Sequence, residues 1–167
     1  AMIERLTHRI QGLITVHRML SASQWSPLPL NDLAGQVIQA TLQTVPTSLN
    51  VEVDVSPSTA QVNAKQANSL ALVLHELVTN AVKHAPPEHA KIHLAIQVNQ
   101  YDGMITLEFR DDGAGFPPEV LNFERHSVGL YLIQRLVRID LRGTLTLHND
   151  EGAVVTIRFS ANPKDVL

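Results

Sequence analysis

Apolar residues recur at steps of three and four along four stretches of the chain, the spacing of one face of an α-helix. The stretches are residues 3–23, 32–44, 65–85 and 127–139. Two prolines in WSPLPLND break the first stretch, and the Asn-Asp pair that follows them can cap the second. The pattern therefore predicts four helices.

Elsewhere the period changes to two, with apolar and polar residues alternating over short segments. The segments are 51–55, 92–98, 105–109, 145–147 and 155–159. Turn-forming residues at 99–103 and 149–152 are typical of hairpins between such strands. Strands with a single apolar face belong to antiparallel or mixed sheets, and amphipathic helices can cover that face. The sequence therefore predicts a two-layer α/β sandwich.

The composition is that of a globular domain, with 44% hydrophobic and 17% charged residues in a chain of 167. No apolar run approaches the ~18 residues needed to cross a bilayer, and the N-terminus does not have the form of a signal peptide. Cysteine is absent, which excludes disulfides and thiolate metal sites and suits a reducing compartment. The net charge of −3 argues against a nucleic-acid partner. An opening Ala-Met before a mid-helix start suggests a piece of a longer protein.

The stretch HELVTNAVKHA, within 65–85, places polar groups among apolar ones. Glu76, Asn80 and Lys83 are spaced so that they share one helix face. Together they suit a Mg²⁺–phosphate group, because an amide oxygen can bind the metal, an ammonium can bind phosphate and a carboxylate can handle a proton. The alternative is a solvated stripe with a Glu–Lys pair, in which Asn80 is out of place as a mediocre helix former.

A second candidate, RDDGAGFPP at 110–118, directly follows a predicted strand. Gly113 and Gly115 allow a tight turn and close approach of the backbone to a ligand, and Asp111 supplies an acceptor. Taken alone, this pattern is also that of an ordinary turn. Gly129 lies near the start of the last predicted helix, where backbone N–H groups attract phosphate. The chain has no Walker-type phosphate loop.

The order and spacing of these motifs resemble the GHKL, or Bergerat-fold, ATP-binding superfamily of histidine kinases, type II topoisomerases, mismatch-repair ATPases and a heat-shock chaperone. ALVLHELVTNAVKHA is similar to the N box of HWE-type histidine kinases and their closest sister group. RIQGLITVHRMLSASQWSPLPLNDL looks like the second helix of their dimerisation and phosphotransfer hairpin. The resemblance implies a mixed, mostly antiparallel five-stranded sheet with about three helices, preceded by an N-terminal helix. It divides the chain into the hairpin helix, 1–26, and a catalytic ATP-binding domain, 27–167.

The resemblance also implies roles at the phosphate end of an ATP site. Asn80 would bind Mg²⁺, and Lys83 and His84 would face the phosphates. Glu76 would act as the general base or proton acceptor near the transfer site.

At the other end, the resemblance implies that Asp111 accepts the adenine amino group. Gly113 and Gly115 would shape the floor of the pocket. Gly129 and Leu130 would close the phosphate side.

The chain departs from the family pattern in four places. FRD at 109–111 stands where HWE kinases have Trp-x-Glu, so the chain looks closer to the sister group. Ser127 stands where many relatives have Gly, and Ala153 follows Gly152 where many have Thr. The lid, about 116–127, is short. These changes bear on ATP affinity and lid closure.

A phosphoacceptor histidine in this family lies on the first hairpin helix. THRIQG at His8 imitates its start, but no Asn follows, so we interpret His8 and His17 as structural and place the acceptor outside the chain. An apolar stripe of the helix over 3–23 would then pair with the absent helix and a second subunit. The stripe consists of Leu6, Ile10, Leu13 and Val16.

We therefore expect a cytoplasmic, ATP-dependent protein histidine kinase, whether or not the parent protein is anchored in a membrane. It would pass the γ-phosphoryl group of ATP to a histidine outside the chain, for relay to the receiver domain of a response regulator. A degenerate docking or histidine phosphotransfer module is the non-enzymatic alternative, but it would be expected to lose Asn80 or the Asp-x-Gly-x-Gly box. An ATP-hydrolysing clamp fits less well, because the hairpin-like lead-in and short lid are typical of kinases.

Overall fold

The computed structural model describes residues 2–44, 48–86, 91–124 and 127–162. Its helices are α1 (Met2–Ala22), α2 (Leu30–Thr44), α3 (Ala64–Lys83), α4 (Pro118–Leu121), α5 (Val128–Arg135) and the π-helical turn η1 (Leu136–Asp140). Its strands are β1 (Leu28–Pro29), β2 (Asn50–Val55), β3 (Gln61–Val62), β4 (Lys91–Tyr101), β5 (Met104–Asp111), β6 (Thr144–Asn149) and β7 (Ala153–Ser160).

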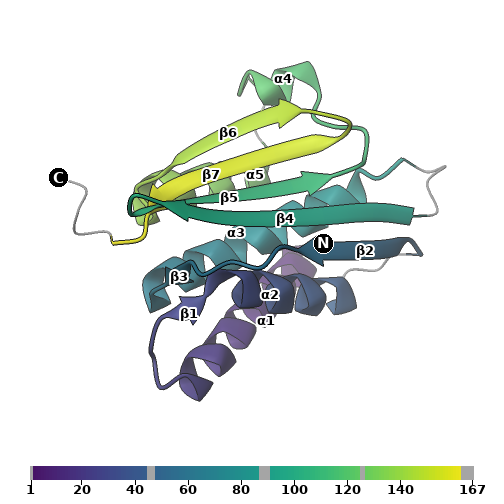
Figure 1. The fold of residues 1–167 in the computed structure, drawn as a ribbon. Helices are drawn as coiled ribbons and strands as arrows, with labels where there is room; N and C mark the ends of the chain where they lie inside the picture. Colours follow the sequence, from purple (N-terminus) through teal and green to yellow (C-terminus); the bar gives the residue numbers. More distant parts are fainter. Residues whose placement is uncertain (1, 45–47, 87–90, 125–126, 163–167) are drawn as a thin grey trace.

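The five longer strands form one sheet in the order β2-β4-β5-β7-β6 (Figure 1). Within this sheet β2 and β4 run parallel, with Val51 opposite Ile92, and all other neighbours are antiparallel. Ile92, Leu94 and Ile96 are buried and alternate with more exposed residues, as the period of two predicts. The predicted mixed, mostly antiparallel five-stranded sheet is confirmed.

Both predicted hairpin turns are present. Asp102 and Gly103 join β4 to β5 with positive φ at both positions, which is typical of a type I′ turn. In the second turn, between β6 and β7, Gly152 also has positive φ. Arg110 of β5 lies opposite Val154 of β7, so this second turn comes to lie beside the end of β5.

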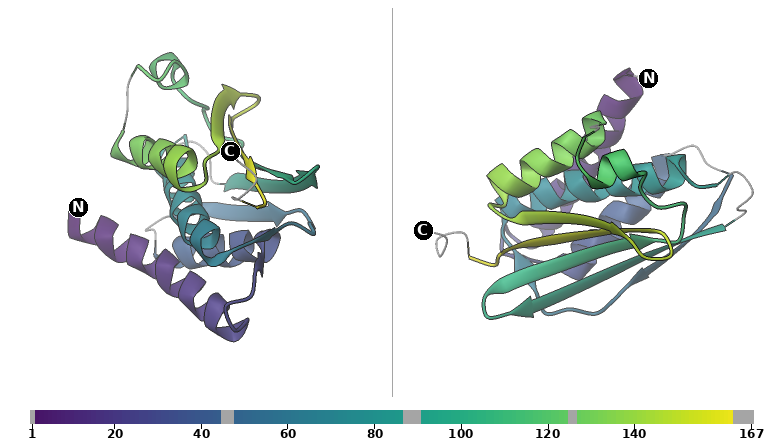
Figure 2. Two further views of the ribbon diagram at one scale, coloured as in Figure 1. Left: turned by 90° about the vertical axis from the view of Figure 1, so that its left-hand side faces the viewer. Right: turned by 90° about the horizontal axis from the view of Figure 1, so that it is seen from above.

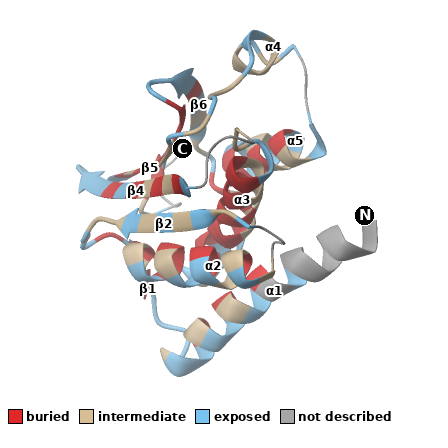
Figure 3. Ribbon diagram, turned by 90° about the vertical axis from the view of Figure 1, so that its right-hand side faces the viewer, coloured by how far each residue is buried: buried red, intermediate tan, exposed pale blue. Residues whose placement is uncertain are grey.

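Helices α2, α3 and α5 cover one face of the sheet, and α1 packs against α2 and α3 on the side away from it (Figure 2). The central helix, α3, is buried along most of its length (Figure 3). Its apolar side chains and the inner face of the sheet form one core, as a two-layer sandwich requires. Within the described ranges, no helix has the length and apolar character needed to cross a bilayer.

Several element boundaries differ from the prediction. α2 begins at Leu30, whose backbone N–H donates to Ala60 O (2.9 Å) next to the β1–β3 pairing. The Asn-Asp pair predicted as its cap therefore lies inside the first turn. α4 occupies part of the stretch predicted as irregular, with Pro118 at its first position, where a missing N–H costs nothing. The last predicted helix changes to π-helical turns at Leu136.

The apolar stripe predicted on α1 is only partly exposed. Ile10 and Leu13 are exposed, whereas Val16 is fully buried, together with Leu20, in the core shared with α2 and α3. The prediction for Val16 was wrong because a helix with apolar residues on two sides does not reveal which side meets its own domain. The side chains of Leu6 and His8 lie outside the described residues.

Candidate functional site

The polar motif HELVTNAVKHA begins in helix α3 and lies at one end of the sheet. The start of α3 is fixed by a capping box, in which Gln66 N donates to the side chain of Asn63 (2.9 Å) and Asn63 N donates to that of Gln66 (3.1 Å). Gln66 also donates to the backbone carbonyl of Ser160 in β7 (2.9 Å), which ties the helix to the sheet. The helix ends at Lys83, so the motif occupies its last turns.

The polar residues of HELVTNAVKHA lie in different surroundings. His75 is buried and its Nδ1 lies 3.2 Å from the hydroxyl of Thr41 in α2, while the hydroxyl of Thr79 donates to the carbonyl of His75 (2.8 Å). His75 therefore faces the protein interior, whereas Thr79 is half-buried and bonds to its own helix. Asn80, Lys83 and His84 instead line a cavity.

Asp111 ends β5 at the opposite wall of this cavity. Its Oδ1 accepts two backbone hydrogen bonds, from Gly113 N (2.9 Å) and from Ala153 N (3.2 Å). Within the described chain, Oδ2 receives no hydrogen bond and is free to accept from a ligand. The pKa of Asp111 is raised, because burial disfavours the carboxylate more than the two N–H donors favour it, and the charge of Asp112 adds to the effect.

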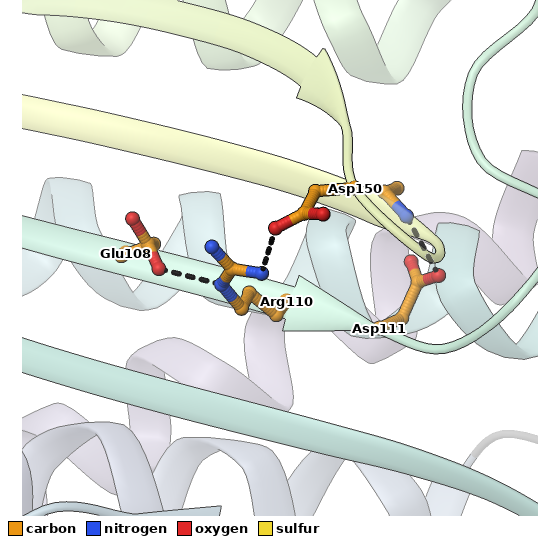
Figure 4. Close-up of polar contacts among 5 residues, drawn as sticks. Glu108, Arg110, Asp111 and Asp150 are labelled. Atoms are coloured by element: carbon orange, nitrogen blue, oxygen red, sulfur yellow. Dashed lines mark hydrogen bonds and ion pairs between the residues drawn. The ribbon is translucent and has the colours of Figure 1, made fainter.

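The β6–β7 turn is pressed against Asp111. Gly152 has a φ of +140°, and a Cβ at this position would overlap the carbonyl oxygen of Asp111. Only glycine fits this conformation and this close approach. On the outer face of the sheet, Arg110 bonds to Glu108 (2.6 Å) and to Asp150 of the same turn (2.9 Å), as Figure 4 shows.

The cavity has a volume of about 580 Å³, a size common for small-molecule sites. Its walls come from α3, the end of β5, the segment after it, α4, α5, β6 and β7. The apolar lining consists of Leu77, Ala81, Phe109, Ala114, Phe116, Pro117, Val120, Leu130, Ile133, Leu147, Ala153 and Val155. The site therefore combines a broad apolar surface with a few polar groups at its two ends.

The structure brings together most, but not all, of the residues that the sequence singled out. Those that line the cavity are Asn80, Lys83, His84, Asp111, Gly113, Gly115 and Leu130. Glu76 and Gly129 lie just behind Asn80 and are not among the lining residues. A Cβ at Gly129 would come within 2.6 Å of Glu76 Oε2 and 3.9 Å of Asn80 Nδ2, so this glycine makes room for the carboxylate.

Ser127, expected from the resemblance to be glycine, caps α5. Its hydroxyl accepts a hydrogen bond from Leu130 N (3.1 Å), one of the N–H groups that a helix start leaves without a partner. The residue also lines the cavity. The Leu130 N–H at the start of α5, which was predicted to close the phosphate side, therefore already donates to the Ser127 side chain.

Ser127→Ala is expected to lower the free energy of unfolding by about 1 kcal/mol, because Leu130 N–H loses its partner. Ser127→Gly should cost only about 0.3 kcal/mol, since glycine is well accepted at a helix start. Urea denaturation of the three proteins measures both differences. Equal losses in the two variants would contradict a capping role.

The sequence did not single out Asn149, and Gly152 was named only through the resemblance, as the residue before Ala153. Both lie in the stretch 149–152, whose residues predicted a hairpin turn. The sequence NDEG, followed by a strand, indicated a turn. Its place beside Asp111 depends on the pairing of β7 with β5. Local periodicity carries no information about such pairing.

Residues 65–163 match the model of a protein family described as histidine kinase-, DNA gyrase B-, and HSP90-like ATPase. A blue-light-activated histidine kinase of Rhizobium johnstonii is 28% identical over 162 residues, covering 95% of this chain and 44% of that protein. The sensor histidine kinase PdtaS of Mycobacterium tuberculosis is 24% identical, covering 95% of this chain and 32% of that protein. The chain thus spans less than half the length of either relative.

Solved structures give the same result for the fold. The Erythrobacter litoralis EL346 blue-light activated histidine kinase superposes with a TM-score of 0.81 at 20% identity, over 99% of this chain and 51% of that one. The separate histidine kinase domain of that protein superposes with a TM-score of 0.76, over 92% of this chain and 78% of that one. These similarities establish the α/β architecture predicted from the sequence.

Proposed function

Because the chain belongs to the family of histidine kinase-, DNA gyrase B- and HSP90-like ATPases, we propose that it binds ATP with Mg²⁺ as the catalytic domain of a sensor histidine kinase. One observation carries the proposal. Asn80 and Lys83 of α3 and Asp111 at the end of β5 line the same cavity, although the two elements lie far apart in the sequence. Its volume of about 580 Å³ suits a nucleotide.

Asp111 recognises the adenine end. Oδ1 is held by the N–H groups of Gly113 and Ala153, so the carboxylate cannot rotate freely and Oδ2 is positioned as an acceptor. An exocyclic amino group is the donor that this acceptor selects. The apolar walls around Phe109 and Leu147 provide contact area for a flat purine ring.

The phosphate end lies at the last turns of α3. Asn80 supplies an amide oxygen for Mg²⁺, and Lys83 and His84 face the phosphate oxygens. Within the described ranges, no three His, Asp or Glu side chains form a metal site. Mg²⁺ is commonly bound by one or two protein ligands, with phosphates and water completing its octahedron. When bound, the ion neutralises charge on the transferring phosphoryl group.

Phosphoryl transfer requires the terminal phosphate to be in line with an incoming nucleophile. The bond from the γ-phosphorus to the bridging oxygen breaks, ADP leaves, and a phosphorus–nitrogen bond forms on a histidine outside this chain. Glu76, adjacent to Asn80 on the same face, takes the role of general base. Gly129 and Leu130 at the start of α5 close this side of the site. The chain's contribution is mainly positioning.

The phosphorylated histidine then passes its phosphoryl group to the receiver domain of a response regulator in the cytoplasm. Residues 1–26 act as the second helix of a dimerisation and phosphotransfer hairpin, and 27–167 as the catalytic domain. Exposure of Ile10, Leu13 and Ile14 on α1 supports this division, because it leaves an apolar surface for the partner helix and a second subunit.

Calorimetry with a non-hydrolysable ATP analogue tests the proposal. Binding is expected in the presence of Mg²⁺ and should weaken when Mg²⁺ is chelated. The chain alone should not label itself with phosphate, because the acceptor histidine lies elsewhere. If no binding is seen with the analogue at millimolar concentration, the docking-module alternative is favoured instead. The cavity and the presence of both Asn80 and Asp111 argue against that alternative.

A further inference from the structure

The segment that follows Asp111 is held at its base by the β6–β7 turn. Asn149 Oδ1 accepts from the backbone N–H of Phe116 (2.8 Å), and its Nδ2 donates to the carbonyl of the same residue (2.9 Å). One side-chain amide thus satisfies both backbone groups of a single residue. The pairing imitates one rung of a β-ladder and fixes Phe116 in position and orientation.

The neighbouring glycine is adapted to this contact. Gly115 has a φ of +77°, and a Cβ there would lie 2.8 Å from both Cγ and Oδ1 of Asn149. A side chain at this position would displace the amide from Phe116. The need for glycine here therefore comes from the Asn149 contact as well as from the turn.

Phe116 is the point where the lid begins. Phe116, Pro117, Glu119 and Val120 all line the cavity, and Phe116 and Val120 also pack against the core. Asn149 itself is exposed, so its amide is not held in place by burial. Its two bonds join the first lid residue to the same turn whose Ala153 N–H holds Asp111.

We propose that Asn149 is a positioning residue that anchors the base of the lid and thereby slows the release of bound nucleotide. The inference rests on the proposed function, because it assigns the cavity to a nucleotide. With the amide in place, Phe116 is fixed, and with it the start of the segment whose residues Pro117, Glu119 and Val120 line the cavity. Without it, Phe116 loses both hydrogen bonds to β6, and the lid keeps the packing of Phe116 and Val120 against the core.

Hydrogen exchange in the nucleotide-free protein tests the anchor itself. Asn149→Ala is expected to speed exchange of the Phe116 amide by about tenfold or more, the size of losing one to two net hydrogen bonds. The Gly113 amide, bonded to Asp111, should keep its protection. Asn122→Ala is the matched control, since it removes an exposed lid asparagine whose side chain is not bonded to the described residues. Unchanged exchange at Phe116 would overturn the proposal.

Stopped-flow release of a fluorescent ATP analogue tests the consequence. Asn149→Ala should raise the dissociation rate about tenfold, with little change in association, because the lid acts after the nucleotide has entered. Asn149→Asp keeps the acceptor and loses the donor, so its rate should lie between those of Asn149→Ala and the unchanged protein. A general loss of stability would not produce this graded change in release.

The two measurements separate the possible failures. Faster exchange at Phe116 with an unchanged dissociation rate overturns the role of Asn149 in nucleotide release, while the proposed function stands. If the unchanged protein binds no nucleotide, the proposed function fails and this role of Asn149 fails with it, whatever the exchange shows.

Discussion

Asp111→Asn is expected to lower the affinity for an ATP analogue by about 100-fold while leaving the fold intact. Asparagine keeps an oxygen that can accept from Gly113 N and Ala153 N, as Asp111 Oδ1 does. Its amide nitrogen then replaces Oδ2, so a donor would face the adenine amino group. Two opposed donors leave a buried polar group unpaired, which costs more than the loss of one hydrogen bond.

The same variant should be as stable as the unchanged protein, or more stable, at pH 7. Burial raises the pKa of Asp111 above its ordinary value. An acid with a raised pKa binds its proton more tightly in the folded state, so stability falls as pH rises through and above the ordinary range of the carboxyl. Asparagine carries no charge and avoids this loss. The advantage should vanish below about pH 4, where the unfolded carboxyl is also protonated.

Thermal unfolding at pH 7 and below about pH 4 measures the stability of Asp111→Asn. Calorimetry measures its affinity for the ATP analogue. Asp112→Asn is the matched control, because Asp112 is exposed and does not line the cavity. Its Oδ1 accepts instead from the backbone N–H of His93 in β4 (2.8 Å). Its nucleotide affinity should hardly change. Asp111→Asn protein that is folded and binds with full affinity would contradict the adenine assignment.

Asn80→Ala is expected to remove most of the Mg²⁺ dependence of nucleotide binding. With Mg²⁺ present, affinity should fall by about 10- to 100-fold, a range typical of weakened metal sites. With Mg²⁺ chelated, the variant and the unchanged protein should bind almost equally, because the amide oxygen acts through the metal. Calorimetric titration under the two conditions gives all four affinities.

Asn68→Ala provides the control for Asn80→Ala. Asn68 lies on the same helix, but it is exposed and does not line the cavity. Its replacement should leave both affinities unchanged. An Asn80→Ala variant that loses affinity equally with and without Mg²⁺ would assign Asn80 to direct nucleotide contact instead of to the metal.

Local pattern predicted the elements of this fold well, because burial on one face leaves a trace in neighbouring residues. The alternation of Ile105, Leu107 and Phe109 predicted β5, and the spacing of Asn80 and Lys83 predicted that they share a helix face. What it could not provide was pairing between distant segments. The contact of Gly152 with Asp111 depends on the position of β7 beside β5, and nothing within NDEG records it.

The exposed stripe on α1 shows the same limit. Val16 and Leu13 are both apolar and three residues apart, yet Val16 is fully buried and Leu13 is 37% exposed. The deciding fact is which side of α1 meets α2 and α3, and this is set by tertiary packing. Ser127 is a different case, because the sequence showed a departure from the glycine of many relatives but not that the side chain caps α5.

The two hairpin turns of the sheet differ in how freely their length can vary. At Asp102–Gly103 the residue Tyr101 is almost fully exposed, and added residues there would extend into solvent. The turn between Asn149 and Ala153 is bounded at one end by the amide that holds Phe116 and at the other by the N–H that holds Asp111. One inserted residue would shift one of these contacts out of register, so a peptide tag belongs in the first turn and not in the second.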